Sequence, residues 1–167
     1  MNKEFEKMLF AETKGFFSER GNEVFYDDLE GRKVLVMEFG EENAPADCTV
    51  SVIEPDDDIT AINIMFTLVS EYPGTAPENM DRLPAVLNKY LTIGNFGFVQ
   101  DSGYFYFSCS LIVDESADIT ETMKLFLSTW EVAYNTSAEG LQVIMPVVNG
   151  SLAVNDLDEE EASIIQF

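Results

Sequence analysis

The chain contains no histidine, and only 9 of its 167 residues are lysine or arginine. Without histidine it cannot form a Ser-His-Asp triad, a Cys-His dyad, a histidine-bearing zinc site or an imidazole general base. The shortage of basic residues argues against DNA, RNA or an anionic membrane surface as a partner, because binding to phosphates depends on lysine and arginine. These absences exclude several classes of enzyme and of nucleic-acid-binding protein.

Cysteine is also scarce, and its spacing matches no metal or redox motif. Cys48 and Cys109 each lie in an apolar run that predicts a strand, and they form no Cys-x-x-Cys pair. We predict buried free thiols, with a disulfide or redox pair as the alternative. The sequence also lacks a glycine-rich phosphate loop, a Walker lysine and a Gly-x-Ser-x-Gly elbow. We therefore expect no cofactor, no bound metal and no catalytic residue.

Long apolar runs are missing as well. No uncharged apolar run approaches the length that spans a bilayer. Residues 1–6 carry charges and no apolar segment of the signal-peptide type, so we expect a cytoplasmic protein with no membrane contact.

Acidic and aromatic residues are abundant. The chain has 31 acidic residues, a net charge of −22, 13 Phe, 6 Tyr and 1 Trp. This aromatic content excludes a disordered chain, and the length predicts one folded domain. For a sphere of about 20 Å radius, the self-energy of this charge is on the order of 10 kcal/mol. The acidity either keeps the protein soluble or favours a cationic partner or divalent ion.

Hydrophobic periodicity and turn residues predict the order of the elements. A helix at 2–19 is followed by a short extended piece at 24–26, a turn at 29–32, and strands at 33–39, 48–54 and 59–69. A helix from Asp81 to about residue 91, strands at 95–99 and 104–113, and a long helix from Asp118 towards Pro146 complete the order.

This order predicts an α+β fold of the form α-β-β-β-α-β-β-α. It consists of one antiparallel five-stranded sheet with helices packed mainly on one face. Residues 1–149 are predicted to form the single domain, and residues 150–167 an acidic, partly flexible C-terminal tail.

The strand at 104–113 supplies the candidate contact residues. Its odd-numbered residues are aromatic or aliphatic around Cys109, so this face is predicted to lie in the core. The opposite face mixes hydroxyl groups with aromatic surface, which favours a protein-contact surface carried by Tyr104, Tyr106 and Ile112.

Two further features have a structural and a functional interpretation. The acidic turn Glu54–Asp58 lacks the spacing of a calcium loop, so we favour a solvated turn over a cation site. Trp130 lies in an apolar stripe of the last helix, which favours a core position over a stacking platform for a ligand.

Local motifs add a family resemblance. They are a leucine-rich helix carrying Leu87-Asn88, the run Gly94-Asn95-Phe96-Gly97-Phe98, and the hairpin Asp101-Ser102-Gly103-Tyr104-Phe105-Tyr106. With the element order, they resemble the YbjN-type family, called bacterial sensory transduction regulators and similar in fold to type III secretion chaperones. The resemblance implies a chaperone-like binding role and no catalytic residues. Members of this family often carry a basic residue in the strand after the hairpin, where this chain has Ser108 and Ser110.

Three functions follow as hypotheses. The first is a non-enzymatic protein-binding or regulatory module that forms a homodimer and holds a protein segment on a sheet face or an exposed helix. The second is an acidic immunity or inhibitor protein that binds a basic partner. The third and most remote is a hydrolase that uses paired carboxylates.

Overall fold

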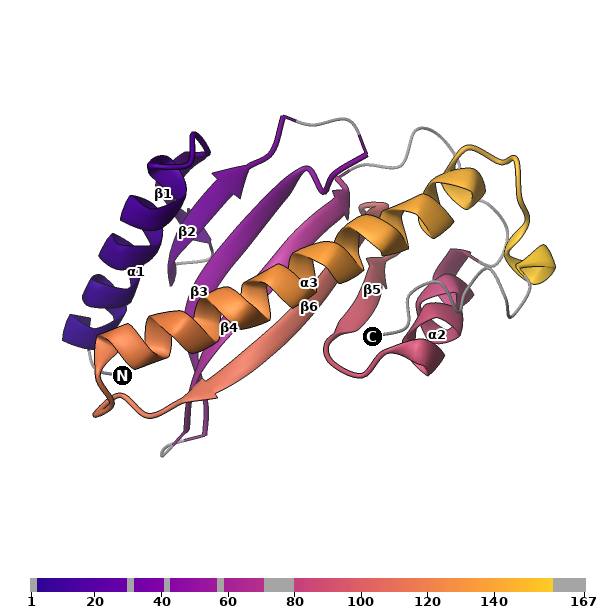
Figure 1. The fold of residues 1–167 in the computed structure, drawn as a ribbon. Coiled ribbons are helices and arrows are strands. Elements are labelled where there is room, and N and C mark those ends of the chain that lie inside the picture. The colour runs from indigo at the N-terminus through magenta and orange to yellow at the C-terminus, as the bar shows by residue number, and fades with distance from the viewer. Residues whose placement is uncertain (1–2, 30–31, 41–42, 57–58, 71–79, 158–167) are drawn as a thin grey trace.

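The strands with alternating apolar residues form one antiparallel sheet in the computed structural model (Figure 1). The structure describes residues 3–29, 32–40, 43–56, 59–70 and 80–157. Its helices are α1 (Lys3–Ser18), α2 (Leu83–Leu87) and α3 (Ile119–Val148). Its strands are β1 (Glu23–Leu29), β2 (Arg32–Glu38), β3 (Asp47–Asp56), β4 (Ile59–Val69), β5 (Asn95–Val99) and β6 (Tyr104–Val113). Short 3₁₀ turns lie at η1 (Met80–Arg82), η2 (Asn88–Tyr90) and η3 (Val154–Asp156).

The sheet of the described residues has six strands in the order β1-β2-β3-β4-β6-β5, and all its pairs are antiparallel. The predicted class, α+β with an antiparallel sheet, is confirmed, but the predicted number of five strands is wrong. The additional strand is β1, of which the sequence indicated only a short extended piece at 24–26. Asp27 and Asp28 interrupt its apolar pattern, and pairing with β2 from Glu23↔Glu38 to Leu29↔Arg32 keeps the segment extended.

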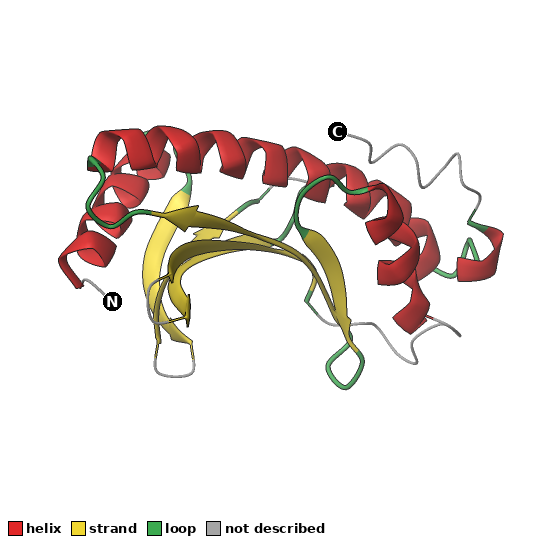
Figure 2. Cartoon of the chain, turned by 90° about the horizontal axis from the view of Figure 1, so that it is seen from below, coloured by secondary structure: helices red, strands yellow, loops and turns green. Residues whose placement is uncertain are grey.

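The helix α3 lies along one face of the sheet and closes the core. Figure 2 shows the sheet as an arch, with α3 running along its convex side. Side chains of β4 and β6 meet this helix: Phe66 lies 5.9 Å from Trp130 and 6.0 Å from Tyr134, measured between ring centroids. Phe66, Phe105, Phe107 and Phe126 are all fully buried. The core therefore lies between α3 and the face of the sheet that carries the phenylalanines.

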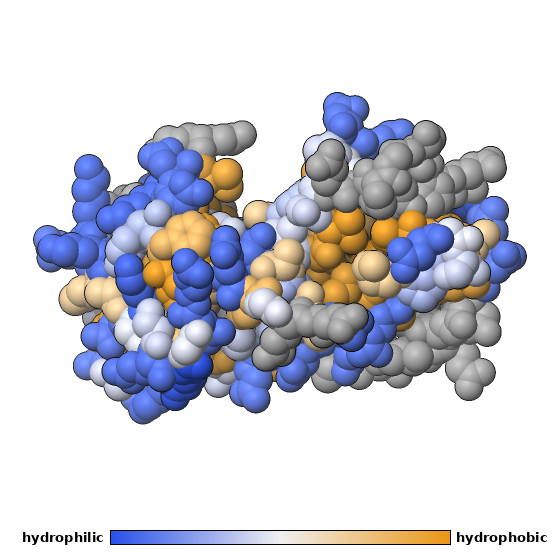
Figure 3. Space-filling model, turned by 90° about the horizontal axis from the view of Figure 1, so that it is seen from above, coloured by the Kyte–Doolittle hydropathy of each residue, from blue (hydrophilic) through white to orange (hydrophobic). Residues whose placement is uncertain are grey.

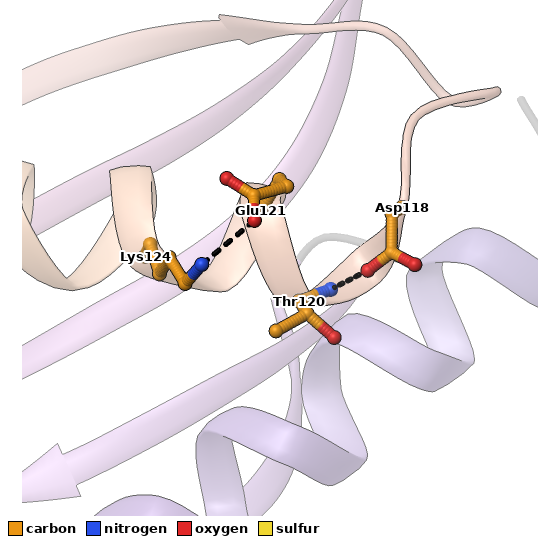
Figure 4. Close-up of polar contacts among 4 residues, drawn as sticks. All are labelled: Asp118, Thr120, Glu121 and Lys124. Carbon is orange, nitrogen blue, oxygen red and sulfur yellow. Dashed lines mark hydrogen bonds and ion pairs between the residues drawn. The ribbon is translucent and has the colours of Figure 1, made fainter.

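The helix α3 begins just after Asp118, where the sequence predicted its start, and Asp118 is its N-cap. The Asp118 carboxylate accepts a hydrogen bond from the Thr120 backbone N–H at 2.7 Å, and Lys124 pairs with Glu121 at 2.7 Å (Figure 4). Hydrogen bonding from Thr120 holds the pKa of Asp118 below its ordinary value. The negative charge of Asp118 also interacts favourably with the positive end of the helix dipole.

The rest of α3 is longer and more regular than the sequence suggested. The polar run Asn135-Thr136-Ser137 does not interrupt it, because Thr136 and Ser137 donate to the carbonyls four residues earlier, at 2.8 and 2.7 Å, and stay inside the helix. Pro146 lies within α3, which ends at Val148. In the last turn a proline removes only one hydrogen bond and does not stop the helix.

The other helices cover the two ends of the sheet. The helix α1 contacts β1 and α3, whereas α2 contacts β5. The predicted second helix is shorter than expected, because only residues 83–87 are α-helical and η1 and η2 extend it on each side. Part of the predicted tail packs on this body, since Val154 is buried. Residues 158–167 lie outside the described part.

Candidate functional site

The candidate contact residues lie on the face of the sheet that points away from α3. Phe105 and Phe107 face the core, so their neighbours Tyr104 and Tyr106 point to the opposite side. The two tyrosine rings are stacked, with centroids 5.7 Å apart and an angle of 28° between their planes. Both side chains are half-buried. The pair therefore offers one continuous aromatic surface on the open side of the arch.

A glycine in the edge strand makes room for this pair. Gly97 on β5 lies opposite Tyr106, and a Cβ atom at Gly97 would lie 2.3 Å from the ring carbon Cζ of Tyr106. The Tyr106 ring therefore lies directly over the backbone of β5, and any side chain at position 97 would block this position. Packing an aromatic ring over a glycine of a neighbouring strand fixes the orientation of the ring.

A buried threonine fixes the orientation of the other tyrosine. Thr67 on β4 donates a hydrogen bond from Oγ1 to Oδ1 of Asp47 at 2.8 Å, and its oxygen lies 3.0 Å from the Tyr104 hydroxyl. A threonine hydroxyl has one hydrogen, so Tyr104 is the donor in the second bond. Partial burial raises the pKa of both Asp47 and Tyr104, and the hydrogen bond that Asp47 accepts from Thr67 opposes the shift at Asp47.

Ile112 lies on the same face as the tyrosines but far from them. It is 70% exposed and is six residues beyond Tyr106 along β6, which corresponds to about 20 Å of extended strand. The residues between them carry hydroxyl groups: Ser108 bonds to Asn95 on β5, and Ser110 bonds to Asn63 on β4. The structure therefore brings Tyr104 and Tyr106 together, and leaves Ile112 at the other end of a polar stretch.

The remaining candidates occupy structural positions. Cys48 and Cys109 are buried free thiols, as predicted, and burial raises the pKa of Cys109 to about 11. Trp130 stacks on Tyr134 with ring centroids 5.2 Å apart, and it packs against the core. The acidic turn Glu54–Asp58 falls largely outside the described side chains. Elsewhere in the described part, no group of three or more acidic or cysteine residues could hold a metal ion.

One feature was missed by the sequence analysis. Basic side chains of α1 and β2 line a groove of about 620 Å³ between these elements and β3. The signal was present as Lys3 and Lys7, which share one helix face, and as Arg32 and Lys33 at the start of a strand. Only the pairing of β1 with β2 brings these two pairs together, and β1 was the strand that the sequence did not predict.

Comparisons with known proteins add no identification. No protein-family model, curated protein or solved structure matches the chain. Within the described residues, no helix has both the length and the apolar character needed to cross a membrane.

Proposed function

We propose that the protein is a non-enzymatic protein-binding or regulatory module that holds a segment of a protein partner on the open face of its sheet. The observation that carries this proposal is the stacked pair of Tyr104 and Tyr106, which alternate along β6 with the buried Phe105 and Phe107 and so lie on the side opposite α3. Tyrosine is enriched at protein interfaces because its ring supplies contact area and its hydroxyl group supplies a hydrogen bond.

The surroundings of the tyrosines support a contact role. Val99, which pairs with Tyr104, is 44% exposed, and Ile112 is 70% exposed. Between them lie the serine and asparagine side chains of β4, β5 and β6. A surface of this kind combines apolar contacts with adaptable hydrogen-bonding groups, a combination that binding surfaces use for extended segments.

The wider proposal follows the family resemblance. We propose that the protein is a cytoplasmic relative of the YbjN-type family. Its helices pack mainly on one face of the sheet, so that the other face stays open to a partner or to a second copy of the chain. The chain then forms a homodimer. The partner is a protein, and neither nucleic acid nor membrane is involved, since the net charge is −22.

The test compares the sheet face with the exposed face of α3. Tyr104→Ala combined with Tyr106→Ala removes the aromatic pair, whereas Leu125→Ala with Val132→Ala removes two exposed apolar side chains from α3. We expect the sheet variant to weaken self-association in analytical ultracentrifugation, or capture of a host partner, at least about tenfold. The helix variant should behave like the wild type, and circular dichroism checks that both fold.

If the sheet variant changes neither self-association nor capture, the assignment of this surface is wrong. If only the helix variant loses binding, the exposed side of α3 is the contact surface. If the partner is captured at low salt but not at high salt, the second hypothesis, an acidic immunity or inhibitor protein with a basic partner, is favoured instead. Binding of that kind depends on charge attraction, which salt screens.

A further inference from the structure

A groove with basic walls lies between the start of α1 and the strands β1, β2 and β3. Its volume of about 620 Å³ is within the range of about 300–1,000 Å³ that is typical of small-ligand sites. The groove is distinct from the aromatic pair, because neither Tyr104 nor Tyr106 is among its lining residues. Its lining includes Lys3, Lys7, Arg32, Lys33, Glu6 and Glu54.

The concentration of positive charge in this groove is unusual for the chain. Four of the nine basic residues of the sequence line it, although acidic residues outnumber basic ones by 31 to 9. Within the described part of the chain, none of these four side chains forms an ion pair, whereas Lys124 pairs with Glu121. Lys3 and Lys7 are one helical turn apart on α1, where like charges repel each other. A bound anion would relieve this repulsion.

Tyr26 supplies a flat wall between the basic groups. Its ring is 42% exposed, and the Nζ atoms of Lys33 and Lys14 lie 4.5 and 4.9 Å from its centroid. Lys14 and the four basic residues that line the groove make up five of the nine basic residues of the chain. The cation–π contacts hold the ammonium groups beside the groove, and Val52 adds apolar surface to the lining.

We propose that this groove binds a small organic anion that carries phosphate groups. Arg32 presents a planar fork that matches two oxygens of a phosphate, and Lys3 and Lys7 add point charges from the opposite wall. The ring of Tyr26 and the side chain of Val52 contact the apolar part of the ligand.

The surroundings of the groove limit the size of the ligand. Glu6 and Glu54 also line it, and Asp27 and Asp28 are exposed on the adjacent strand β1. A nucleic acid or an anionic bilayer would extend beyond the four cations and meet these carboxylates. A small anion can stay within reach of the basic groups alone.

The test uses inorganic pyrophosphate and ADP as probes of the full-length protein, with adenosine as the uncharged comparison. Isothermal titration calorimetry gives the affinity, and amide NMR shifts locate the site. We expect both phosphates to shift amides in residues 3–10, 26, 32–33 and 52–54, and adenosine to bind at least about tenfold more weakly than ADP. Absence of phosphate binding at millimolar concentration would overturn the proposal.

Matched charge variants separate a built site from general attraction of anions. Lys7→Gln combined with Arg32→Gln removes one cation from each wall, and we expect the affinity for ADP to fall about tenfold or more. Lys89→Gln combined with Lys124→Gln makes the same change in net charge away from the groove and should leave the affinity within about twofold. Equal losses in both variants would indicate an adventitious ion only.

Two further arms test other occupants. A full-length variant with Glu159→Gln, Glu160→Gln and Glu161→Gln keeps the chain length but removes acidic groups of the tail. If pyrophosphate and ADP bind this variant and not the wild type, the acidic C-terminal segment itself occupies the groove in the wild type, and the proposal fails. If a short DNA duplex or vesicles containing phosphatidylserine bind at the groove more tightly than ADP, the limit on ligand size is wrong.

Discussion

Thr67 links three neighbouring strands through a single hydroxyl group. It donates to Asp47 on β3 and accepts from Tyr104 on β6, and its side chain is only 4% exposed. No apolar side chain can replace these two bonds. The position therefore connects the stability of the sheet to the orientation of a candidate contact residue.

We predict that Thr67→Val lowers the free energy of unfolding by about 1–2 kcal/mol at pH 7, because the partly buried Asp47 carboxylate loses a donor. Burial already raises the pKa of Asp47, and loss of the hydrogen bond raises it further. A raised folded-state pKa costs stability only where the carboxyl group is ionised, so part of the loss should disappear below the unfolded-state pKa of about 3.9. Urea denaturation at pH 7 and at pH 3 measures both effects.

Thr129→Val is the matched control for this prediction. Thr129 donates to the carbonyl of Leu125 at 2.9 Å on the exposed side of α3, and water can replace that bond. We expect a change within about 0.5 kcal/mol. Equal losses at positions 67 and 129, or a loss at position 67 that is the same at both pH values, would contradict the role given to Asp47.

Among the elements, the edge strand β5 depends on a side chain from the neighbouring turn η2. The Asn88 amide group donates to the carbonyl of Phe96 at 3.0 Å, and its oxygen accepts from the N–H of Phe96 at 2.7 Å. Asn88 thus satisfies the backbone groups that an edge strand leaves open. The same two bonds attach the α2 region to the sheet.

We predict that Asn88→Ala lowers the free energy of unfolding by about 2 kcal/mol, since two backbone groups lose their partner. Hydrogen exchange should accelerate most at the amide of Phe96. Asn63→Ala is the control, because the Asn63 side chain accepts a hydrogen bond from the Ser110 side chain on an exposed face and holds no backbone group of β5 among the described contacts. Unchanged protection of Phe96 in the Asn88 variant would show that this contact does not hold the edge strand.

Two helical glycines have opposite surroundings and give the next prediction. A Cβ atom at Gly140 of α3 would lie 2.3 Å from the ring of Phe96, which is fully buried, whereas Gly15 of α1 has nothing within 4 Å. Alanine has the higher helix propensity at both sites by about 1 kcal/mol. We expect Gly15→Ala to stabilise the protein by about 0.5–1 kcal/mol, and Gly140→Ala to destabilise it by about 1–2 kcal/mol because overpacking outweighs propensity.

Thermal and urea denaturation of the two variants measure this difference. A gain in stability from Gly140→Ala would mean that the contact between α3 and Phe96 adjusts freely, and that the packing of the helix on β5 is looser than the structure indicates.

Most elements could be predicted from the sequence, but the contacts between them could not. The ranges of β4, β5 and β6 were predicted correctly because apolar alternation there is uninterrupted. The full range of β1 was not predicted, because its acidic residues interrupt the apolar alternation. Pairing with β2 stabilises this strand in the structure. Tyr104 and Tyr106 could be found from the alternation along one strand. The contact of Thr67 with Asp47, and the placement of Lys3 and Arg32 in one groove, depend on strand pairing that periodicity alone does not reveal.

In the molecule as a whole, the acidic side chains lie mainly outside the hydrophobic core. The buried side chains are mainly apolar, and acidic residues lie at the ends of elements and on exposed helix and strand positions. Figure 3 shows hydrophilic side chains around the outline of one face, with hydrophobic atoms visible mainly towards its middle. The acidic excess therefore opposes folding mainly through long-range repulsion, with the partly buried Asp47 as a local exception.

This distribution predicts that salt stabilises the protein. Raising NaCl from 20 to 500 mM shortens the Debye length from about 20 Å to about 4 Å, which screens repulsion in the folded chain more than in the expanded unfolded chain. We expect the free energy of unfolding to rise by about 1–3 kcal/mol.

A variant with Glu19→Gln, Glu23→Gln and Glu131→Gln, three exposed positions, should be more stable than the wild type at 20 mM NaCl and should gain less from salt. Lys89→Gln with Lys124→Gln, which makes the net charge more negative, should gain more. Urea denaturation of the three proteins at both salt concentrations checks the order, and identical gains in all three would show that salt acts on apolar burial and not on the net charge.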